Sequence, residues 1–292
     1  MADFALEPRG PFSLQAAGRF LSDFPPADNQ GLGEHGTIRL AFVLDDFSGA
    51  AAVALRQARE DGPVEVEVAG TDRLDGVRRQ LERVLGLEHD GVAFVAVLDR
   101  DPVLRELWER TGHLRQVSFP SPYEAACWAV IALRLRQAQG VRVRQLIEEK
   151  LGERIEVAGL PLQAFPTPAR LRGLGGVDAL TEAKGPRLRA LADAALEGRL
   201  DPYALRDLPQ EEAIDRLREL PGLGPFYAAL VLLRATGARD AFVPIERLRR
   251  AAARAYDLPA APNEEAFTEL AERWRPFRSW ACVLLRAGER SR

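Results

Sequence analysis

The segment Leu220-Pro-Gly-Leu-Gly-Pro225 restricts the fold of this 292-residue chain more than any other stretch. Apolar residues repeat with helical spacing on both sides of it, over Glu211–Leu220 and Pro225–Thr236. Gly222 and Gly224 allow a tight turn with backbone angles that other residues avoid, and a proline suits the first position of the helix that follows. The segment therefore predicts two helices that are joined by a short turn and fold back on each other as a hairpin.

Such a turn can also bind an anion. The backbone N–H groups of Gly222, Leu223 and Gly224, together with the positive end of the second helix, are suited to holding one phosphate group. The alternative is an ordinary turn between two helices, because Gly-x-Gly is a common sequence. The turn alone does not decide between these two interpretations.

Composition limits the class of protein. The chain is 47% hydrophobic and 28% charged, which is typical of globular domains, and its length predicts two of them. No stretch reaches the roughly 18 apolar residues of a membrane span, and the N-terminus lacks a secretion signal, so we expect a cytoplasmic protein. Two cysteines exclude a four-cysteine zinc or iron–sulfur site. We expect no metal site.

The charge is unevenly distributed. Residues 1–112 contain 12 basic and 20 acidic residues, whereas residues 113–292 contain 28 basic and 23 acidic ones. Lys150 and Lys184 are the only lysines, so the basic residues are almost all arginines. This asymmetry indicates that the second part of the chain meets a polyanion. The alternative is a coding preference for arginine without any function.

The first 116 residues predict a small antiparallel sheet with helices. Thr37–Leu44 and Val64–Val68 alternate as half-buried strands do, and the apolar run Phe94–Leu98 suits a short central strand. Asp72–Leu87 has one apolar helical face. In Asp101–Arg110, Asp101 is expected to be the N-cap, with a proline at the first helical position.

After the proline-containing linker Val117–Pro122, nearly everything is expected to be helical. Tyr123–Gln139 predicts one apolar helix, and Val141–Leu151 a second one after Gly140. The predicted fold class is therefore α+β, with a sheet domain over residues 1–116 and an all-α domain over residues 117–292. The further predicted helices begin near Pro168 or cover 186–197, 245–256, 264–273 and 278–286.

Two more motifs follow the hairpin, Asp240-Ala-Phe-Val-Pro-Ile-Glu246 and Arg273-Trp-Arg-Pro-Phe-Arg-Ser-Trp280. The segments Phe119-Pro-Ser-Pro122 and Phe165-Pro-Thr-Pro168 precede it. In this order and spacing, residues 117–286 resemble the helix-hairpin-helix DNA glycosylase superfamily, most closely its bacterial DNA-3-methyladenine glycosylase II branch. The resemblance implies a small sheet domain followed by an all-α glycosylase domain.

The resemblance also implies an activity, monofunctional base-excision repair of alkylated purines of the 3-methyladenine type. In such enzymes the hairpin grips the DNA backbone, the damaged nucleotide is flipped into a pocket, and a carboxylate stabilises positive charge on the sugar as the N-glycosidic bond breaks. The family's catalytic Asp falls on Glu246, whose side chain is longer by about 1.5 Å. The structural alternative for Glu246 is an acid that stabilises the start of a helix.

Other family positions fall on Arg134, the wedge that fills the gap left by the flipped base, and on Leu133 and Phe226, which would line the base pocket. A solvated helix face explains Arg134 equally well, and core packing explains Phe226. Relatives that cut the DNA strand carry a lysine at the position of Phe226, so we expect no strand cleavage.

The resemblance implies duplex DNA containing damaged bases as the partner, with no membrane, no obligate protein partner and a monomeric chain near the nucleoid. It implies no cofactor other than a monovalent cation at the contact between hairpin and phosphate. The alternative function is a damage-binding or architectural DNA-binding protein on the same scaffold, whose chemistry is weakened because Glu replaces Asp.

Overall fold

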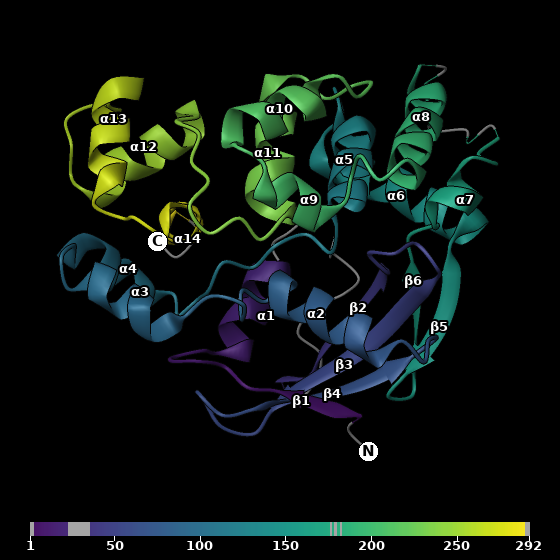
Figure 1. Cartoon of the computed structure of the whole chain (residues 1–292), viewed down its shortest axis with the longest axis horizontal. Coiled ribbons are helices and arrows are strands. Elements are labelled where there is room, and N and C mark those ends of the chain that lie inside the picture. Colours follow the sequence, from purple (N-terminus) through teal and green to yellow (C-terminus); the bar gives the residue numbers. More distant parts are fainter. Residues whose placement is uncertain (1–2, 23–35, 176, 178–179, 182, 290–292) are drawn as a thin grey trace.

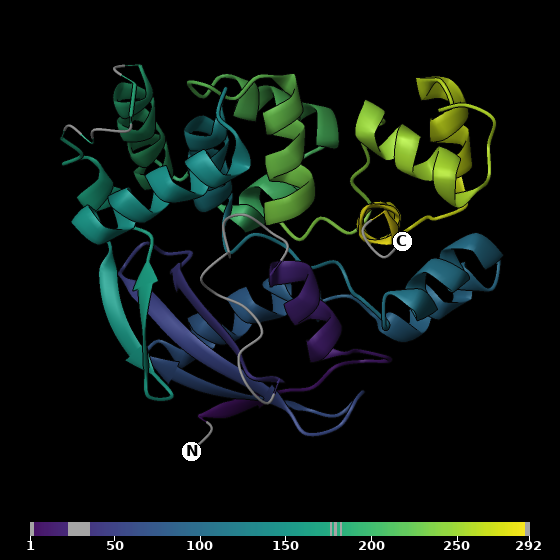
Figure 2. The same cartoon turned by 180° about the vertical axis from the view of Figure 1, so that it is seen from behind.

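The computed structural model describes residues 3–22, 36–175, 177, 180–181 and 183–289. A sheet lies at one side of the molecule and a group of helices at the other (Figure 1). Figure 2 shows the same division from behind. The strands are β1 (Phe4–Leu6), β2 (Ile38–Val43), β3 (Ala50–Gln57), β4 (Val64–Ala69), β5 (Glu153–Val157) and β6 (Leu160–Ala164). The first four helices are α1 (Leu14–Ser22), α2 (Leu74–Val84), α3 (Gly91–Leu98) and α4 (Pro102–Arg110). The later ones are α5 (Pro122–Ala132), α6 (Gln137–Leu151), α7 (Pro168–Leu171), α8 (Lys184–Leu196), α9 (Pro202–Asp207), α10 (Gln210–Arg218), α11 (Pro225–Ala235), α12 (Glu246–Ala255), α13 (Glu264–Glu272) and α14 (Arg278–Gly288).

The main sheet is antiparallel with the order β1-β4-β3-β2. The α+β fold class is thereby confirmed, as are the strands predicted around β2 and β4 and the helices predicted around α2 and α4. Asp101 caps α4, since its carboxylate accepts a hydrogen bond from the Leu104 N–H at 3.1 Å.

One face of the sheet is covered by a second hairpin that the sequence analysis missed. Ala41, Ala52 and Ala54 are small and fully buried on this face, and Ile155 and Val157 of the β5–β6 hairpin pack against them. The expectation that nearly all of the chain after Tyr123 is helical is therefore wrong for this segment. Alanine side chains permit the close approach of the second hairpin, because they leave room above the sheet.

The apolar run at Phe94–Leu98 is part of α3, so the predicted central strand is wrong. The helix begins where the Asp90 carboxylate accepts hydrogen bonds from the N–H groups of Val92 and Ala93. A short buried helix and a buried strand have the same apolar composition, and only this cap distinguishes them.

The break between α5 and α6 also differs from the prediction. The helices separate at residues 133–136, where Arg134 has a positive φ of 58°. The Gln139 side chain accepts a hydrogen bond from the Arg136 N–H and so starts α6. Gly140 lies inside α6, where a Cβ would come within 3.1 Å of the Trp128 ring. Its role is thus close packing of the two helices and not a helix end.

The hydrophobic core crosses the expected boundary between residues 116 and 117. One buried cluster combines residues of α1–α4 and the sheet with residues of α12–α14. The Asp101 carboxylate, for example, accepts hydrogen bonds from the Trp274 indole at 3.0 Å and the Tyr256 hydroxyl at 2.6 Å. A second cluster holds α5–α11 together. The two-domain division remains a prediction, whereas the packing joins the first and last parts of the chain.

Candidate active site

The predicted hairpin consists of α10 and α11. Gly222 has a positive φ of 92°, and a Cβ at this position would lie 2.9 Å from Cγ2 of Val130 in α5. Gly224 is the N-cap of α11 and faces open space. The Leu223 N–H donates to the Leu220 carbonyl at 3.1 Å, and the Leu223 side chain is buried. Gly222 therefore keeps the turn close to α5, while Leu223 is engaged within the turn itself.

The C-terminal end of α5 lies close to this turn. Exposed Arg134 follows it, and Arg187 of α8 packs beside Gly222, with its Cδ 3.4 Å from the position of an added Cβ. The Lys184 ammonium is buried and donates to the Ile131 carbonyl at 2.8 Å, which holds the last turn of α5. Burial, with a smaller contribution from Arg187, lowers the pKa of Lys184.

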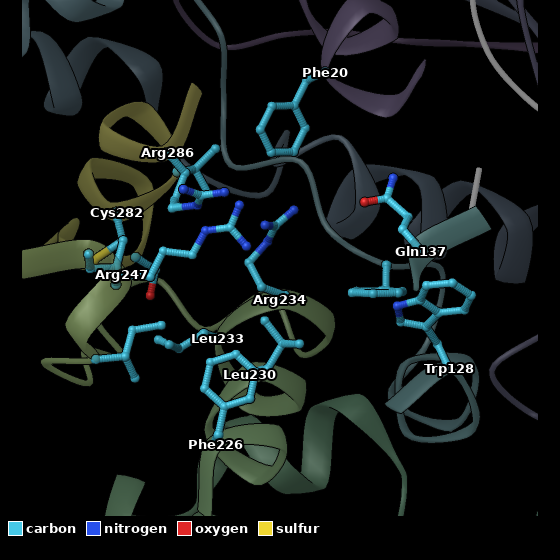
Figure 3. Close-up of a pocket in the computed structure, with 15 residues that line it drawn as sticks. Phe20, Trp128, Gln137, Phe226, Leu230, Leu233, Arg234, Arg247, Cys282 and Arg286 are labelled. Atoms are coloured by element: carbon cyan, nitrogen blue, oxygen red, sulfur yellow. The ribbon is translucent and has the colours of Figure 1, made fainter. Parts of the chain in front are cut away.

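A cavity of about 250 Å³ opens between α5, α11, the start of α12 and one side of α14. Four aromatic side chains line it, Phe20, Phe119, Trp128 and Phe226, and Figure 3 shows the three labelled ones on different sides of a group of arginine side chains. Arginines from three helices reach the same space. These arginines are Arg234, Arg247 and Arg286. The other lining residues are Gln137, Leu230, Leu233, Ile245, Leu248, Ser279, Cys282 and Val283.

Of the two predicted pocket residues, Phe226 lines this cavity and Leu133 does not. Phe226 is 48% exposed, and its ring contacts that of Tyr227 edge-to-face. A ring so exposed on a helix is available to a ligand, because core packing would bury it. Leu133 lies in the turn after α5, beside Arg134.

Glu246 begins α12 but is not among the lining residues of the cavity. Its carboxylate is exposed and forms an ion pair with Arg250. It belongs to an adjoining polar cleft, which shares Arg247 and Arg286 with the cavity. Exposed ion pairs of this kind contribute little free energy, so the carboxylate can change partners at small cost.

The loop before Glu246 is held by Asp240. Its carboxylate pairs with Arg275 and accepts a hydrogen bond from Nε of Arg278 at 3.0 Å. The Ser279 hydroxyl donates to the Ala241 carbonyl at 2.7 Å. These contacts bind the loop to the start of α14 and so place the first turn of α12 beside the cavity.

The thiol of Cys282 also bears on the chemistry of the site. Burial raises the pKa of the Cys282 thiol to about 12, so this wall residue stays protonated and is not a nucleophile. Within the described ranges, no three His, Cys, Asp or Glu side chains come together in a way that could hold a metal ion. None of the helices in that part of the chain has the length and apolar character that a membrane span requires.

Most of the cavity wall could not be predicted from the sequence. Phe20, Trp128 and Arg286 come from α1, α5 and α14, and in the sequence each belongs to a pattern typical of a helix or core. Arg247 carried a signal, because it follows Glu246 directly in a basic helix. Phe119, Ile245 and Ser279 lie within the motifs of the sequence, but nothing in those motifs marks them as cavity residues.

Comparison with known proteins gives this geometry its context. No family model matches the chain. The DNA-3-methyladenine glycosylase of Bacillus subtilis is 25% identical over 205 residues, which cover 68% of this chain and 67% of that protein. DNA-3-methyladenine glycosylase 2 of Escherichia coli is 31% identical over 171 residues, 57% of this chain and 56% of that protein. Over these stretches the chain is similar in sequence to DNA-3-methyladenine glycosylases.

A solved structure extends this likeness to the N-terminal part of this chain. The 3-methyladenine DNA glycosylase of Archaeoglobus fulgidus has a TM-score of 0.78 and 26% sequence identity, and the match covers 97% of this chain and 96% of that one. The resemblance to helix-hairpin-helix DNA glycosylases is thereby confirmed, including the sheet at the N-terminus. The sequence match covers about two thirds of the B. subtilis protein and somewhat over half of the E. coli protein.

Proposed function

We propose that this protein is a monofunctional DNA glycosylase of base-excision repair that hydrolyses the N-glycosidic bond of alkylated purines flipped out of duplex DNA. The observation that carries the proposal is the aromatic-walled cavity between the hairpin helix α11 and the start of α12. Its volume of about 250 Å³ lies just below that of the pockets that take drug-sized ligands, about 300–1,000 Å³, and suits a single base. The homology to DNA-3-methyladenine glycosylases supports the same conclusion.

Glu246 supplies the anion in the proposed reaction. As the base leaves, the sugar acquires oxocarbenium character, and a carboxylate beside it lowers the energy of that state. The sugar of a flipped nucleotide stays at the cavity mouth, where α12 begins. Glu246 must therefore turn away from Arg250 when DNA binds, and the exposed ion pair makes this turn inexpensive. An alkylated purine is already a good leaving group, so the site needs little general acid.

The hairpin and Arg134 hold the DNA in this proposal. N–H groups of the turn at Gly222, Leu223 and Gly224 face a phosphate, with a monovalent cation at the contact. Because the Leu223 N–H already donates within the turn, the two glycines carry most of this contact. Exposed Arg134 enters the gap that the flipped base leaves. The protein would act as a cytoplasmic monomer.

The decisive experiment measures release of free base from methylated duplex DNA by the purified chain. Glu246→Gln should slow release by about 10²–10³, as loss of one well-placed electrostatic group does, while DNA affinity stays similar. Glu106→Gln is the matched control, since Glu106 also forms an exposed i,i+4 ion pair, with Arg110 in α4, away from the cavity. Base release that is unaffected by Glu246→Gln would remove the catalytic assignment.

The same assay separates the enzyme from a damage-binding protein. A wild-type chain that binds methylated DNA but releases no base would overturn the proposal. We also expect no strand cleavage, because Phe226 has no amine to attack the sugar. Borohydride should therefore trap no covalent adduct with DNA.

A further inference from the structure

The cavity carries more positive charge than a site for a cationic base should. Arg234, Arg247 and Arg286 come from α11, α12 and α14, and their side chains extend toward one another in the centre of the cavity (Figure 3). Among the described residues that line the cavity, none is an aspartate or a glutamate. Glu289, which pairs with Arg286, lies outside the lining.

Two of these guanidinium groups are held firmly in the wall. The Arg234 guanidinium donates to the Val117 carbonyl at 3.0 Å and lies 5.1 Å from the centre of the Phe20 ring. The Arg286 side chain is only 16% exposed. Arg247 is exposed at the mouth, where it also lines the cleft of Glu246. The arginines thus extend from the inner wall of the cavity to its entrance.

A wall of guanidinium groups is suited to a particular kind of base edge. A guanidinium group has five N–H donors and no acceptor, so a base that reaches it must present oxygen or unprotonated ring nitrogen. A purine methylated at N3 or N7 is cationic in the nucleotide, and like charges at close range repel. Sites that select cations surround them with aromatic faces. In this cavity the aromatic side chains lie beside guanidinium groups, which are themselves positively charged.

We propose that the cavity selects neutral damaged bases that carry a carbonyl oxygen over cationic methylated purines, and that Arg247 and Arg286 determine this specificity. The inference rests on the proposed glycosylase function and changes the preferred substrate within it, from cationic alkylated purines to neutral damaged bases. Bases that are neutral within the nucleotide and have acceptors along their edge receive hydrogen bonds from the arginine wall, whereas cationic bases gain only the aromatic contacts.

The test uses duplexes with a single hypoxanthine or a single N7-methylguanine. Both are purines with a carbonyl oxygen at position 6, and only the second is cationic. Arg286→Met and Arg247→Met remove donors and charge but keep an unbranched side chain of similar apolar stem. Each variant should release hypoxanthine ~10–100-fold more slowly, the effect of losing a hydrogen bond to a charged group, while N7-methylguanine release is unchanged or faster. Comparing each variant with wild type cancels the different spontaneous lability of the two bases.

Arg56→Met is the control, because Arg56 forms an exposed ion pair with Glu67 on the sheet, and both rates should stay at the wild-type level. Arg247 is exposed, so its variant remains informative if Arg286→Met does not fold. Equal slowing of the release of both bases would mean that the arginines hold a phosphate of the flipped nucleotide, and would overturn the inference while the glycosylase function stands. Variants that release both bases at the wild-type rate would overturn the inference as well. A wild-type chain that releases neither base would refute the proposed function itself, and this inference with it.

Discussion

Gly222 and Gly224 lie two residues apart in the hairpin turn, and the structure gives them different requirements. Gly222 has φ of 92° and no space for a Cβ, whereas Gly224 has φ of −71° and open surroundings. Gly222→Ala should therefore lower the free energy of unfolding by about 1–3 kcal/mol, the cost of a strained backbone. Gly224→Ala should change it by less than about 0.5 kcal/mol. Urea unfolding of the two variants measures the difference, and equal stability would contradict the assignment of the turn.

His89 is a buried residue whose protonation should affect acid stability. Burial, followed by the charges of Arg239, Arg206 and Arg115, lowers its pKa from 6.5 to about 4. Between these two values the unfolded chain binds a proton that the folded chain does not, so the free energy of unfolding falls as the pH falls from 6.5 to 4. The full contribution is about 3 kcal/mol, because each tenfold loss of proton affinity corresponds to about 1.4 kcal/mol.

His89→Gln should remove this part of the acid dependence. Urea unfolding at about pH 6.5 and about pH 4.5, inside the window between the two pKa values, should show a smaller loss of stability in the variant than in the wild type. His113→Gln, at a partly exposed position, is the control for replacing a histidine elsewhere in the fold. If wild type and His89→Gln lose stability in parallel, His89 is not the group responsible.

At the scale of elements, helices with a clear apolar face could be predicted from the sequence, and short segments could not. Helices α2, α4 and α11 have strong periodicity or marked starts, such as Pro225 after Gly224. The errors fall where tertiary contacts decide. The β5–β6 hairpin depends on an alanine face contributed by distant strands, and the break after α5 falls at Arg134, a residue type that gives no local signal for positive φ.

The last turn of α5 is held by a hydrogen bond from Lys184. Its ammonium is buried and donates to the Ile131 carbonyl. Lys184→Met leaves that carbonyl without its donor and should lower the free energy of unfolding by about 1–3 kcal/mol. It should also reduce base release, because Arg134 and the Gly222 turn lie against the same helix end. Lys150→Met, at the exposed end of α6, is the control for both measurements. A Lys184→Met protein as stable as the control would show that the contact is dispensable.

At the scale of the whole molecule, the cavity is made by segments that are far apart in the chain. Phe20 in α1 and Arg286 in α14 meet there with Trp128 and Phe226 of the central helices. The resemblance to DNA glycosylases gave Glu246 and Phe226 their predicted roles, since both residues lie in the region whose motifs carry that resemblance. It could not predict the arginine wall, because that wall exists only after α11, α12 and α14 have packed together.

The first and last parts of the chain should fold as one unit. Phe94 of α3 stacks on Trp280 of α14 with ring centres 3.8 Å apart and an angle of 7° between planes, and both belong to the cluster that spans the first and last parts of the chain. A fragment of residues 117–292 would expose Trp280, Phe277 and Leu284, which are buried in the full chain. We therefore expect the fragment alone to lack the near-ultraviolet circular dichroism of fixed aromatic rings.

The full chain, in contrast, should unfold in a single transition, and Phe94→Ala should destabilise it by about 3–5 kcal/mol, as truncation of a core aromatic does. Adding residues 1–116 to the fragment should restore the aromatic signal, because that piece supplies the partners of α14. A fragment that folds alone and binds duplex DNA would instead support two independent domains that meet at residue 117. In that case Phe94→Ala would weaken only the contact between them, and two unfolding transitions would appear.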